Sequence, residues 1–227
     1  MDARFLLLPE TTPSAPARRA GKAAPGPDPV MHIRRYRAGR PVFMAGDAAT
    51  TIHEVAQGTV MLSRMLTDGR RQIVDIIGPG RLFGFAADGR HDCTAEALTA
   101  SMVCSLDCAA ATASPLINAR ILRAMGEDIR KLRDLALLLG RKTAIERVAS
   151  LLAAMAGPGA EADMAISLPV TRAEIADYLG LTVETVSRTL TRLRQSGLIG
   201  LEGSETVRLA DPAAIRALAE GEAMQAA

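Results

Sequence analysis

The chain has 227 residues, of which 48% are hydrophobic, so it is long enough to form one large or two small packed domains. Its aromatic content of 3%, with no Trp, argues against the aromatic stacking platforms that hold single-stranded nucleic acid. The formal net charge of +2 gives no general signal for nucleic-acid binding, so any contact with duplex DNA must come from a local arrangement of residues.

The chain shows no sign of export or of membrane insertion. Its beginning, MDARFLLLPE, has an apolar run that is too short for the core of a secretory signal, and no later segment reaches membrane-spanning length. The three cysteines, Cys93, Cys104 and Cys108, are an odd number and do not suggest a disulfide framework. We therefore expect a cytoplasmic protein without a membrane partner.

Residues 1–30 are predicted to form a disordered tail rich in proline and alanine. Half of the 12 prolines lie there, mixed with small and basic residues, a composition that cannot bury much apolar surface. Arg18, Arg19 and Lys22 offer contacts to phosphate, but a solvated tail is the preferred interpretation.

Residues 31–114 contain short apolar runs that are separated by turn residues. The connections AGD, QG, TDGR, GPG and ADGR recur at the regular spacing of an all-β barrel or sandwich. We predict that this segment forms a β-roll. Because helical patterns follow it, the whole chain is predicted to be α+β.

Beyond Pro115 the periodicity becomes helical, and residues 115–141 are predicted to form a long dimerisation helix. Its apolar residues, spaced alternately three and four apart, form a heptad seam: Leu122, Met125, Ile129, Leu132, Ala136 and Leu139. A helix packed on its own domain would also carry an apolar stripe. The strongly charged residues beside the seam make the stripe narrow, which favours a parallel homodimer.

Residues 142–227 are predicted to form a winged helix-turn-helix domain. Thr171 is followed three residues later by a glutamate, as in a capping box, and Thr182 can cap a second helix. Gly180 and Val186 stand at the offsets of the turn glycine and the apolar anchor of a helix-turn-helix. The pattern GLIGLEGSETVRLAD then predicts a hairpin that forms the wing.

The second helix of this motif carries a polar cluster. Its inner face is predicted to hold the apolar residues Val183, Val186, Leu190 and Leu193. At about 100° per residue, the outer face holds Glu184, Arg188, Thr191 and Gln195, with Ser187 at its edge. A routine ion pair between residues four apart is one interpretation of this cluster, and DNA reading is the preferred one.

The segment YLGLTVETVSRTLTRL resembles the recognition helix of the CRP/FNR superfamily of bacterial transcription regulators. Its E-x-x-S-R pattern is similar to the FNR and FixK branch, and the resemblance extends over about residues 31–220. It implies that Glu184, Ser187 and Arg188 read base edges in a TTGA-containing half-site. The chemistry agrees, because arginine can clamp guanine and glutamate can accept from cytosine. Further DNA contacts are expected from Thr171, Thr182, Thr191 and Arg192.

The resemblance implies that the β-roll is a sensor-like jelly roll of the kind that binds cyclic nucleotide in CRP-like proteins. The residues that bind the nucleotide there are not matched in this chain. The Gly-Glu pair of that family becomes Gly84 and Phe85, and its Arg-Ser pair becomes Cys93 and Thr94. A cyclic phosphate would therefore lose its charge partner, so we do not expect cAMP to bind.

Oxygen-sensing FNR proteins hold an iron–sulfur cluster on an N-terminal group of cysteines and one in the β-roll. Cys104 stands where the β-roll ligand would be, but three cysteines cannot supply four thiolates within one subunit. The histidines show no ligand spacing with the cysteines; they are His32, His53 and His91. We expect no metal and no cofactor, and interpret the cysteines as packing residues or mildly reactive thiols.

Together, these patterns and the resemblance to the CRP/FNR superfamily imply a homodimeric DNA-binding transcription regulator with RNA polymerase as a further partner. The predicted site is a TTGA-N6-TCAA-like palindrome, and the resemblance to FixK-type proteins implies control of microaerobic, respiratory or nitrogen metabolism. No catalytic triad, phosphate loop or carboxylate dyad is recognisable, so we do not expect an enzyme. The alternative is a regulator of the same fold that is gated by a small molecule or haem.

Overall fold

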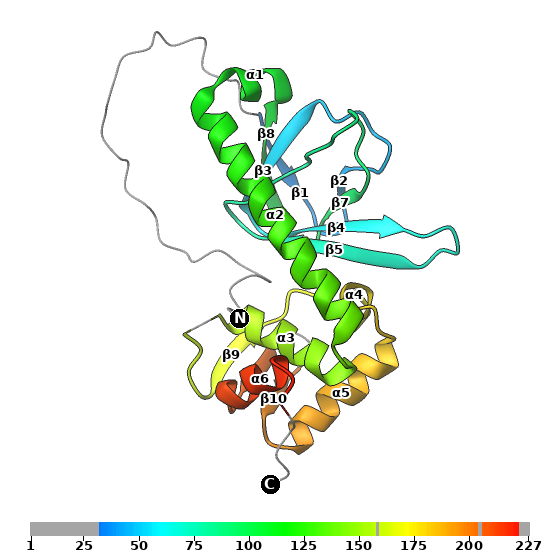
Figure 1. The fold of residues 1–227 in the computed structure, drawn as a ribbon, viewed down its shortest axis with the longest axis vertical. Coiled ribbons are helices and arrows are strands. Elements are labelled where there is room, and N and C mark those ends of the chain that lie inside the picture. The colour runs from blue at the N-terminus through cyan, green and yellow to red at the C-terminus, as the bar shows by residue number, and fades with distance from the viewer. Residues whose placement is uncertain (1–31, 158, 204–205, 223–227) are drawn as a thin grey trace.

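The computed structural model describes residues 32–157, 159–203 and 206–222, and the predicted tail at residues 1–30 lies outside these ranges. A β-roll is followed by a long helix and by a small C-terminal α+β part (Figure 1). Within the described ranges, no helix is both long and apolar enough to cross a membrane. The predicted α+β fold class is confirmed.

The β-roll consists of two four-stranded antiparallel sheets. The first has the order β1-β8-β3-β6 and is made of β1 (His32–Tyr36), β8 (Ser101–Asp107), β3 (Thr51–Gln57) and β6 (Leu82–Phe83). The second has the order β2-β7-β4-β5 and is made of β2 (Pro41–Phe43), β7 (Thr94–Ala97), β4 (Val60–Met65) and β5 (Arg71–Ile77). Side chains along β8 are alternately buried and half-buried, as a strand with one face on the core requires.

The turn between β3 and β4 depends on a glycine that the sequence pattern marks as a loop residue. Gly58 has a φ of 84°, which is a left-handed conformation that favours glycine. A Cβ atom here would lie 2.4 Å from Oγ of Ser101, so the close approach of β8 also requires glycine. At this turn the chain passes from β3 in the first sheet to β4 in the second sheet.

The core of the β-roll includes two imidazole rings. The apolar members of this core are Phe43, Val55, Val60, Ile77, Phe83, Ala95 and Val103. The ring of His91 stacks on that of Phe43 with centroids 3.6 Å apart, and the His53 ring lies 5.2 Å from that of Phe83. Nδ1 of His53 is 2.8 Å from Oγ of Ser105, so this buried ring has the hydrogen-bond partner that burial demands.

A short helix, α1 (Cys108–Ala113), leads into the long helix α2 (Pro115–Arg141), which runs along the β-roll (Figure 1). Proline suits the first position of α2 because the N–H that it lacks would have no partner within the helix. One face of α2 is buried through Ile121, Leu135 and Leu138. After Arg141, two residues connect α2 to α3 (Ala144–Ala156).

The C-terminal part combines helices with a small sheet. Its elements are β9 (Met164–Ser167), α4 (Arg172–Leu179), α5 (Val183–Gln195), β10 (Ile199–Glu202), β11 (Thr206–Leu209) and α6 (Pro212–Ala219). Strands β10 and β11 form the predicted hairpin, and β9 adds a third strand that the sequence analysis missed. Strand β9 buries only Ile166, so its sequence carries no clear alternation.

The β-roll and the C-terminal part share one apolar core. Met61 and Ile73 from the second sheet belong to the same buried cluster as Leu135 of α2 and Leu179 of α4. The hairpin formed by β4 and β5 lies against α4 at this point (Figure 1). The position of the helix-turn-helix is therefore coupled to the β-roll by packing.

The buried imidazole of His53 makes the stability of the fold depend on pH. Burial, with a smaller contribution from neighbouring His91, lowers the pKa of His53 from 6.5 to about 4. As pH falls, the imidazole of His53 therefore binds a proton in the unfolded chain at a higher pH than in the folded protein. The free energy of unfolding should decrease by up to about 3 kcal/mol between pH about 6.5 and about 4. Urea unfolding across this range should show a smaller decrease for His53→Gln than for the parent, and equal decreases would contradict the assignment.

Candidate nucleic-acid interface

The first helix of the helix-turn-helix begins at a capping box and ends at a left-handed glycine. The hydroxyl of Thr171 accepts from the Glu174 backbone N–H at 3.2 Å, and the Glu174 carboxylate accepts from the Thr171 N–H at 2.6 Å. Gly180 ends α4 with a φ of 61°. A Cβ at Gly180 would lie 3.3 Å from Cδ2 of Leu139, so the helix end also packs closely against α2. These local predictions from the sequence agree with the structure.

The second helix, α5, starts where the sequence predicts. The hydroxyl of Thr182 accepts from the backbone N–H of Thr185 at 3.1 Å, which satisfies one of the free donors at the helix start. Residues 180–182 therefore form a tight connection between α4 and α5, with a glycine at one end and a cap at the other.

The inner face of α5 differs from the prediction at its first residue. Val186, Leu190 and Leu193 are buried as expected, but Val183 is 47% exposed. Val183 lies about 70° from the centre of the buried face, so the helix turns it toward solvent. Thr189 is buried instead, and its hydroxyl donates to the carbonyl oxygen of Thr185 at 2.7 Å, which lets a polar side chain enter the core.

The outer face of α5 presents polar side chains to solvent. Glu184, Ser187 and Arg188 are exposed, and among the described residues none of them has a hydrogen bond or ion pair with another side chain. In particular, within the described part of the chain the structure forms no ion pair between Glu184 and Arg188. Arg192 is exposed and Thr191 is half-buried on the flanks of the same face.

Two arginines that the sequence analysis did not single out lie beside this motif. Arg172 is the first residue of α4, and its Nη1 is buried without a hydrogen-bond partner within the described part of the chain. Burial lowers the pKa of Arg172, because the charged form is poorly solvated. Arg147 of α3 donates to the carbonyl oxygen of Leu179 at 2.8 Å. Neither the burial of Arg172 nor the contact of Arg147 is visible in a local pattern, since both depend on tertiary packing.

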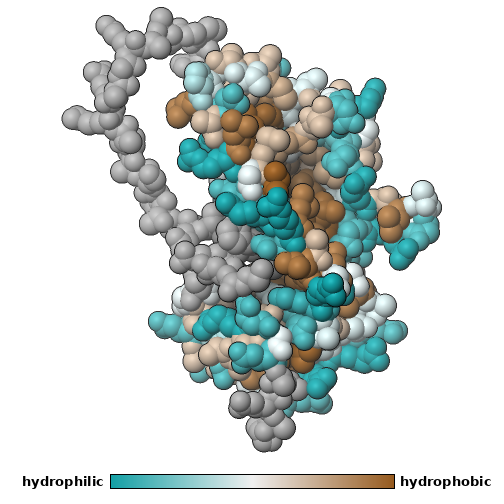
Figure 2. Space-filling model, viewed as in Figure 1, coloured by the Kyte–Doolittle hydropathy of each residue, from teal (hydrophilic) through white to brown (hydrophobic). Residues whose placement is uncertain are grey.

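The predicted seam on α2 faces away from the β-roll. Its large apolar residues are between 42% and 63% exposed: Leu122, Met125, Ile129 and Leu132. Ala136 is exposed too, whereas Leu139 is half-buried against the chain's own core. Figure 2 shows apolar side chains gathered in a band along this helix. The helix thus packs on its own domain with one face and leaves a second apolar face open.

Gly84 and Phe85, which the resemblance aligns with the nucleotide-sugar pair of CRP-like proteins, are packed against other side chains. Gly84 has a φ of 88°, and a Cβ there would lie 2.9 Å from Cδ2 of His53 and 3.4 Å from the Phe43 ring. The next side chain, Phe85, packs against the cluster that contains Ile121 of α2. No carboxylate or open cradle is present at these two residues.

The position of the nucleotide phosphate is equally unsuited to an anion. Cys93 packs against the β-roll core, and burial together with the nearby Asp92 carboxylate raises the pKa of its thiol to about 12. The Thr94 hydroxyl accepts from the backbone N–H of Ala45 at 3.1 Å, so it is already engaged. A neutral thiol and an occupied hydroxyl offer no counter-charge for a phosphate.

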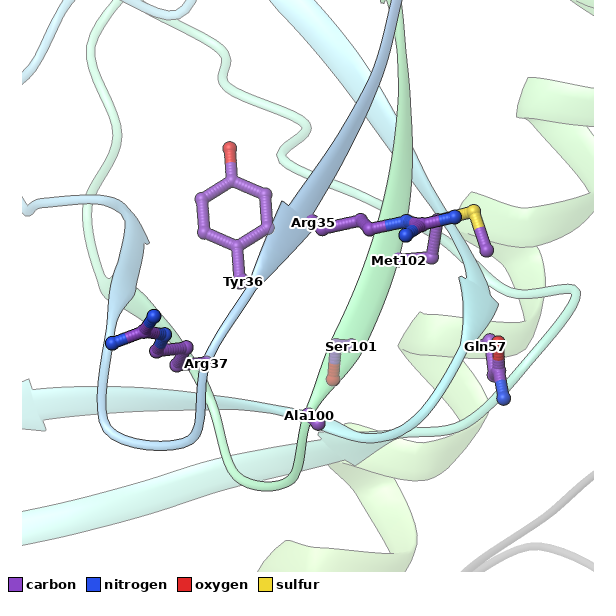
Figure 3. A pocket seen from close by; sticks show the side chains of 7 residues that line it. All are labelled: Arg35, Tyr36, Arg37, Gln57, Ala100, Ser101 and Met102. Carbon is purple, nitrogen blue, oxygen red and sulfur yellow. The ribbon is translucent and has the colours of Figure 1, made fainter.

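A shallow depression lies elsewhere on the β-roll, with a volume of about 570 Å³. It is lined by Arg35, Tyr36, Arg37, Gln57, Ala100, Ser101 and Met102. Figure 3 shows Arg35, Tyr36 and Arg37 pointing in different directions, so their polar groups do not converge on one ligand. Among the described residues, no group of three or more His, Cys, Asp or Glu side chains is arranged to hold a metal ion. At residues 84, 85, 93 and 94, therefore, the β-roll is occupied by the chain's own side chains.

Two models of known protein families match parts of this chain. Residues 146–218 match the Crp-like helix-turn-helix domain, and residues 33–113 match the cyclic nucleotide-binding domain. The chain is 36% identical over 210 residues to the nitrogen fixation regulation protein FixK of Rhizobium meliloti, covering 85% of this chain and 91% of that protein. It is also 36% identical over 196 residues to the transcriptional activator protein FnrL of Cereibacter sphaeroides, covering 80% and 78%.

The fold is also similar to that of a solved relative. The structure of FixK2 from Bradyrhizobium japonicum superposes with a TM-score of 0.77 at 33% sequence identity, covering 87% of this chain and all of that one. A CRP-family transcriptional regulator from Thermus thermophilus gives a TM-score of 0.71 at 28% identity, with 86% and 100% covered.

The filled sugar and phosphate positions predict that cyclic nucleotide has no effect on this protein. Millimolar cAMP should leave the melting temperature unchanged, because no charged group at residues 84, 85, 93 and 94 can compensate the desolvated phosphate. Calorimetric titration of cAMP should give only heats of dilution, while a DNA duplex selected by the protein serves as the positive control. Saturable heat on adding cAMP would overturn this conclusion.

Proposed function

Because the chain belongs to the CRP/FNR family of transcription regulators, we propose that it acts as a homodimer on a two-fold symmetric DNA site. The observation that carries the proposal is the outer face of α5, where Glu184, Ser187 and Arg188 are exposed and have no partner among the described side chains. An α-helix fits the major groove of B-DNA, where each base pair presents a distinct pattern of donors and acceptors. The cluster supplies side chains suited to that pattern.

We assign each residue of the cluster a separate task. Arg188 donates two hydrogen bonds to O6 and N7 of a guanine, and Glu184 accepts from the N4 amino group of a cytosine. Ser187, at the edge of the outer face, adapts its hydroxyl to a neighbouring base. Thr171, Thr182, Thr191 and Arg192 then contact the surrounding DNA. In a TTGA half-site these assignments place Arg188 on the guanine.

The homodimer is proposed from the open apolar face of α2. Exposed apolar residues at heptad spacing on a long helix are typical of a surface that a second helix covers. A parallel pairing of two α2 helices brings the two copies of α5 into a two-fold arrangement. Two half-sites with TTGA and TCAA arms, whose centres lie about one helical turn apart, match such a dimer.

We further propose that the protein activates transcription in the cytoplasm by contacting RNA polymerase. The support is the function of similar proteins, since FnrL is a transcriptional activator and FixK is a nitrogen fixation regulator. The genes under control are then those of microaerobic, respiratory or nitrogen metabolism. A search for bound promoters in living cells by chromatin immunoprecipitation tests this assignment.

Replacing Arg188 tests the recognition face. Arg188→Ala should cost about 1–3 kcal/mol on the cognate site and much less on scrambled DNA, because it removes a bidentate contact to one base. Arg194→Ala is a matched control, since Arg194 is an exposed arginine on the same helix outside the outer face. Fluorescence anisotropy on both duplexes measures the ratio. If Arg188→Ala keeps the parental ratio of cognate to scrambled affinity, the recognition face is assigned wrongly.

Charging the seam tests the homodimer. Ile129→Glu places a carboxylate in the proposed contact, where it would be buried without a partner, so the dimer should dissociate and DNA affinity should collapse. Leu116→Glu is the control, because Leu116 is 83% exposed on the same helix but lies outside the seam. Light scattering gives the mass of each variant. A monomeric parent, or an Ile129→Glu variant that stays dimeric, would refute the proposed interface.

A further inference from the structure

The last turn of α4 is held at three consecutive residues by side chains from other elements. Nε of Arg71, on β5, donates to the Asp177 carboxylate at 2.7 Å, and Nε2 of Gln72 donates to the carbonyl oxygen of Tyr178 at 3.2 Å. Arg147, on α3, donates to the carbonyl oxygen of Leu179 at 2.8 Å. We define the α4 clamp as Arg71, Gln72 and Arg147.

The clamp uses groups that the helix itself leaves unsatisfied. The last four carbonyls of an α-helix have no partner within the helix and carry the negative end of its dipole. Gln72 and Arg147 donate to two such carbonyls of α4, and the guanidinium charge of Arg147 suits that end. The pair of Arg71 and Asp177 is only 28% and 29% exposed, so solvent screens it less than an open surface pair.

Arg147 also ties α4 to the end of α2. Its Nη2 donates to the carbonyl oxygen of Leu139 at 2.7 Å, and its Nε donates to that of Lys142 at 2.9 Å. One side chain thus spans the end of α2, the two-residue connection after it and the end of α4. Lys142 joins the same connection to the end of α6, because its Nζ donates to the carbonyl oxygen of Ala219 at 2.6 Å.

The α4 clamp contacts the chain immediately before α5. Gly180 follows the clamped turn directly, and α5 begins three residues later at Val183. Because the connection is short and capped at both ends, the direction of α5 follows the direction of α4. In a dimer formed through α2, the clamp therefore determines how far each α5 lies from the two-fold axis.

We propose that Arg71, Gln72 and Arg147 are positioning residues that set the distance between the two DNA half-sites which the dimer accepts. This inference rests on the proposed homodimer and its palindromic site. In this proposal, the β4–β5 hairpin of the β-roll holds the helix-turn-helix in one orientation through Arg71 and Gln72. That orientation selects the spacing of the half-sites. Half-site sequence preference remains with the outer face of α5.

The test compares the affinity for duplexes whose TTGA and TCAA arms are separated by five, six or seven base pairs. The parent should discriminate between these spacers. Arg71→Ala should lower that discrimination by about three- to tenfold, as expected for the loss of one coupled contact. Base preference at the guanine assigned to Arg188 should stay at the parental value.

Three further variants separate positioning from a general loss of stability. Arg70→Ala is the matched control, because Arg70 pairs with Asp68 on the exposed side of the same hairpin, away from the carboxylate that Arg71 holds on α4. The double exchange Arg71→Asp with Asp177→Arg should restore part of the discrimination. Arg147→Lys should lower it while thermal unfolding reports whether the variant is folded.

The possible outcomes distinguish this inference from the proposed function. Equal loss of affinity on all spacers, or unchanged discrimination in folded Arg71→Ala and Arg147→Lys, overturns the positioning role. A parent that binds the arms specifically but accepts every spacer equally overturns it as well. A parent that binds no TTGA palindrome at all overturns the proposed function instead.

Discussion

The guanidinium of Arg147 joins the ends of two helices on which the rest of the structure depends. It donates to carbonyl oxygens of Leu139 and Lys142 at the end of α2 and of Leu179 at the end of α4. Each of these helix ends would otherwise present unsatisfied acceptors to a partly buried joint. A planar group with five donors can satisfy several of them at once, which a lysine cannot do in the same geometry. The position of α4 relative to α2 therefore depends on this side chain.

The β-roll is filled by its own side chains at the residues that the family resemblance aligns with nucleotide binding. Imidazole and phenyl rings pack against Gly84, and Phe85 packs with Ile121 of α2. A half-buried group of charges lies at the same boundary, since Arg81 contacts Asp75 at 2.6 Å and Asp128 of α2 at 3.0 Å. Arg81 thereby links α2 to the β-roll through charged hydrogen bonds, which solvent screens less than it would at an open surface.

The proposed DNA contact of this nearly neutral chain lies on the outer face of α5. The polar groups of Glu184, Ser187 and Arg188 are not consumed by contacts with other described side chains, so they remain available for base edges. The caps at Thr171 and Thr182 satisfy the helix starts and thereby orient these side chains without using them. In the proposed function, the local arrangement of these side chains, and not the net charge, provides the contact with DNA.

The sequence by itself determined the features that depend on neighbours a few residues apart. The capping box at Thr171, the left-handed Gly180 and the cap at Thr182 follow from such local hydrogen bonds, and the α+β class follows from the change of period near Pro115. Only the tertiary structure decided that Val183 is exposed, that β9 joins the wing and that the α4 clamp forms. The clamp joins residues 32 and 106 positions apart, and which donor meets which helix end is fixed by packing that no local pattern encodes.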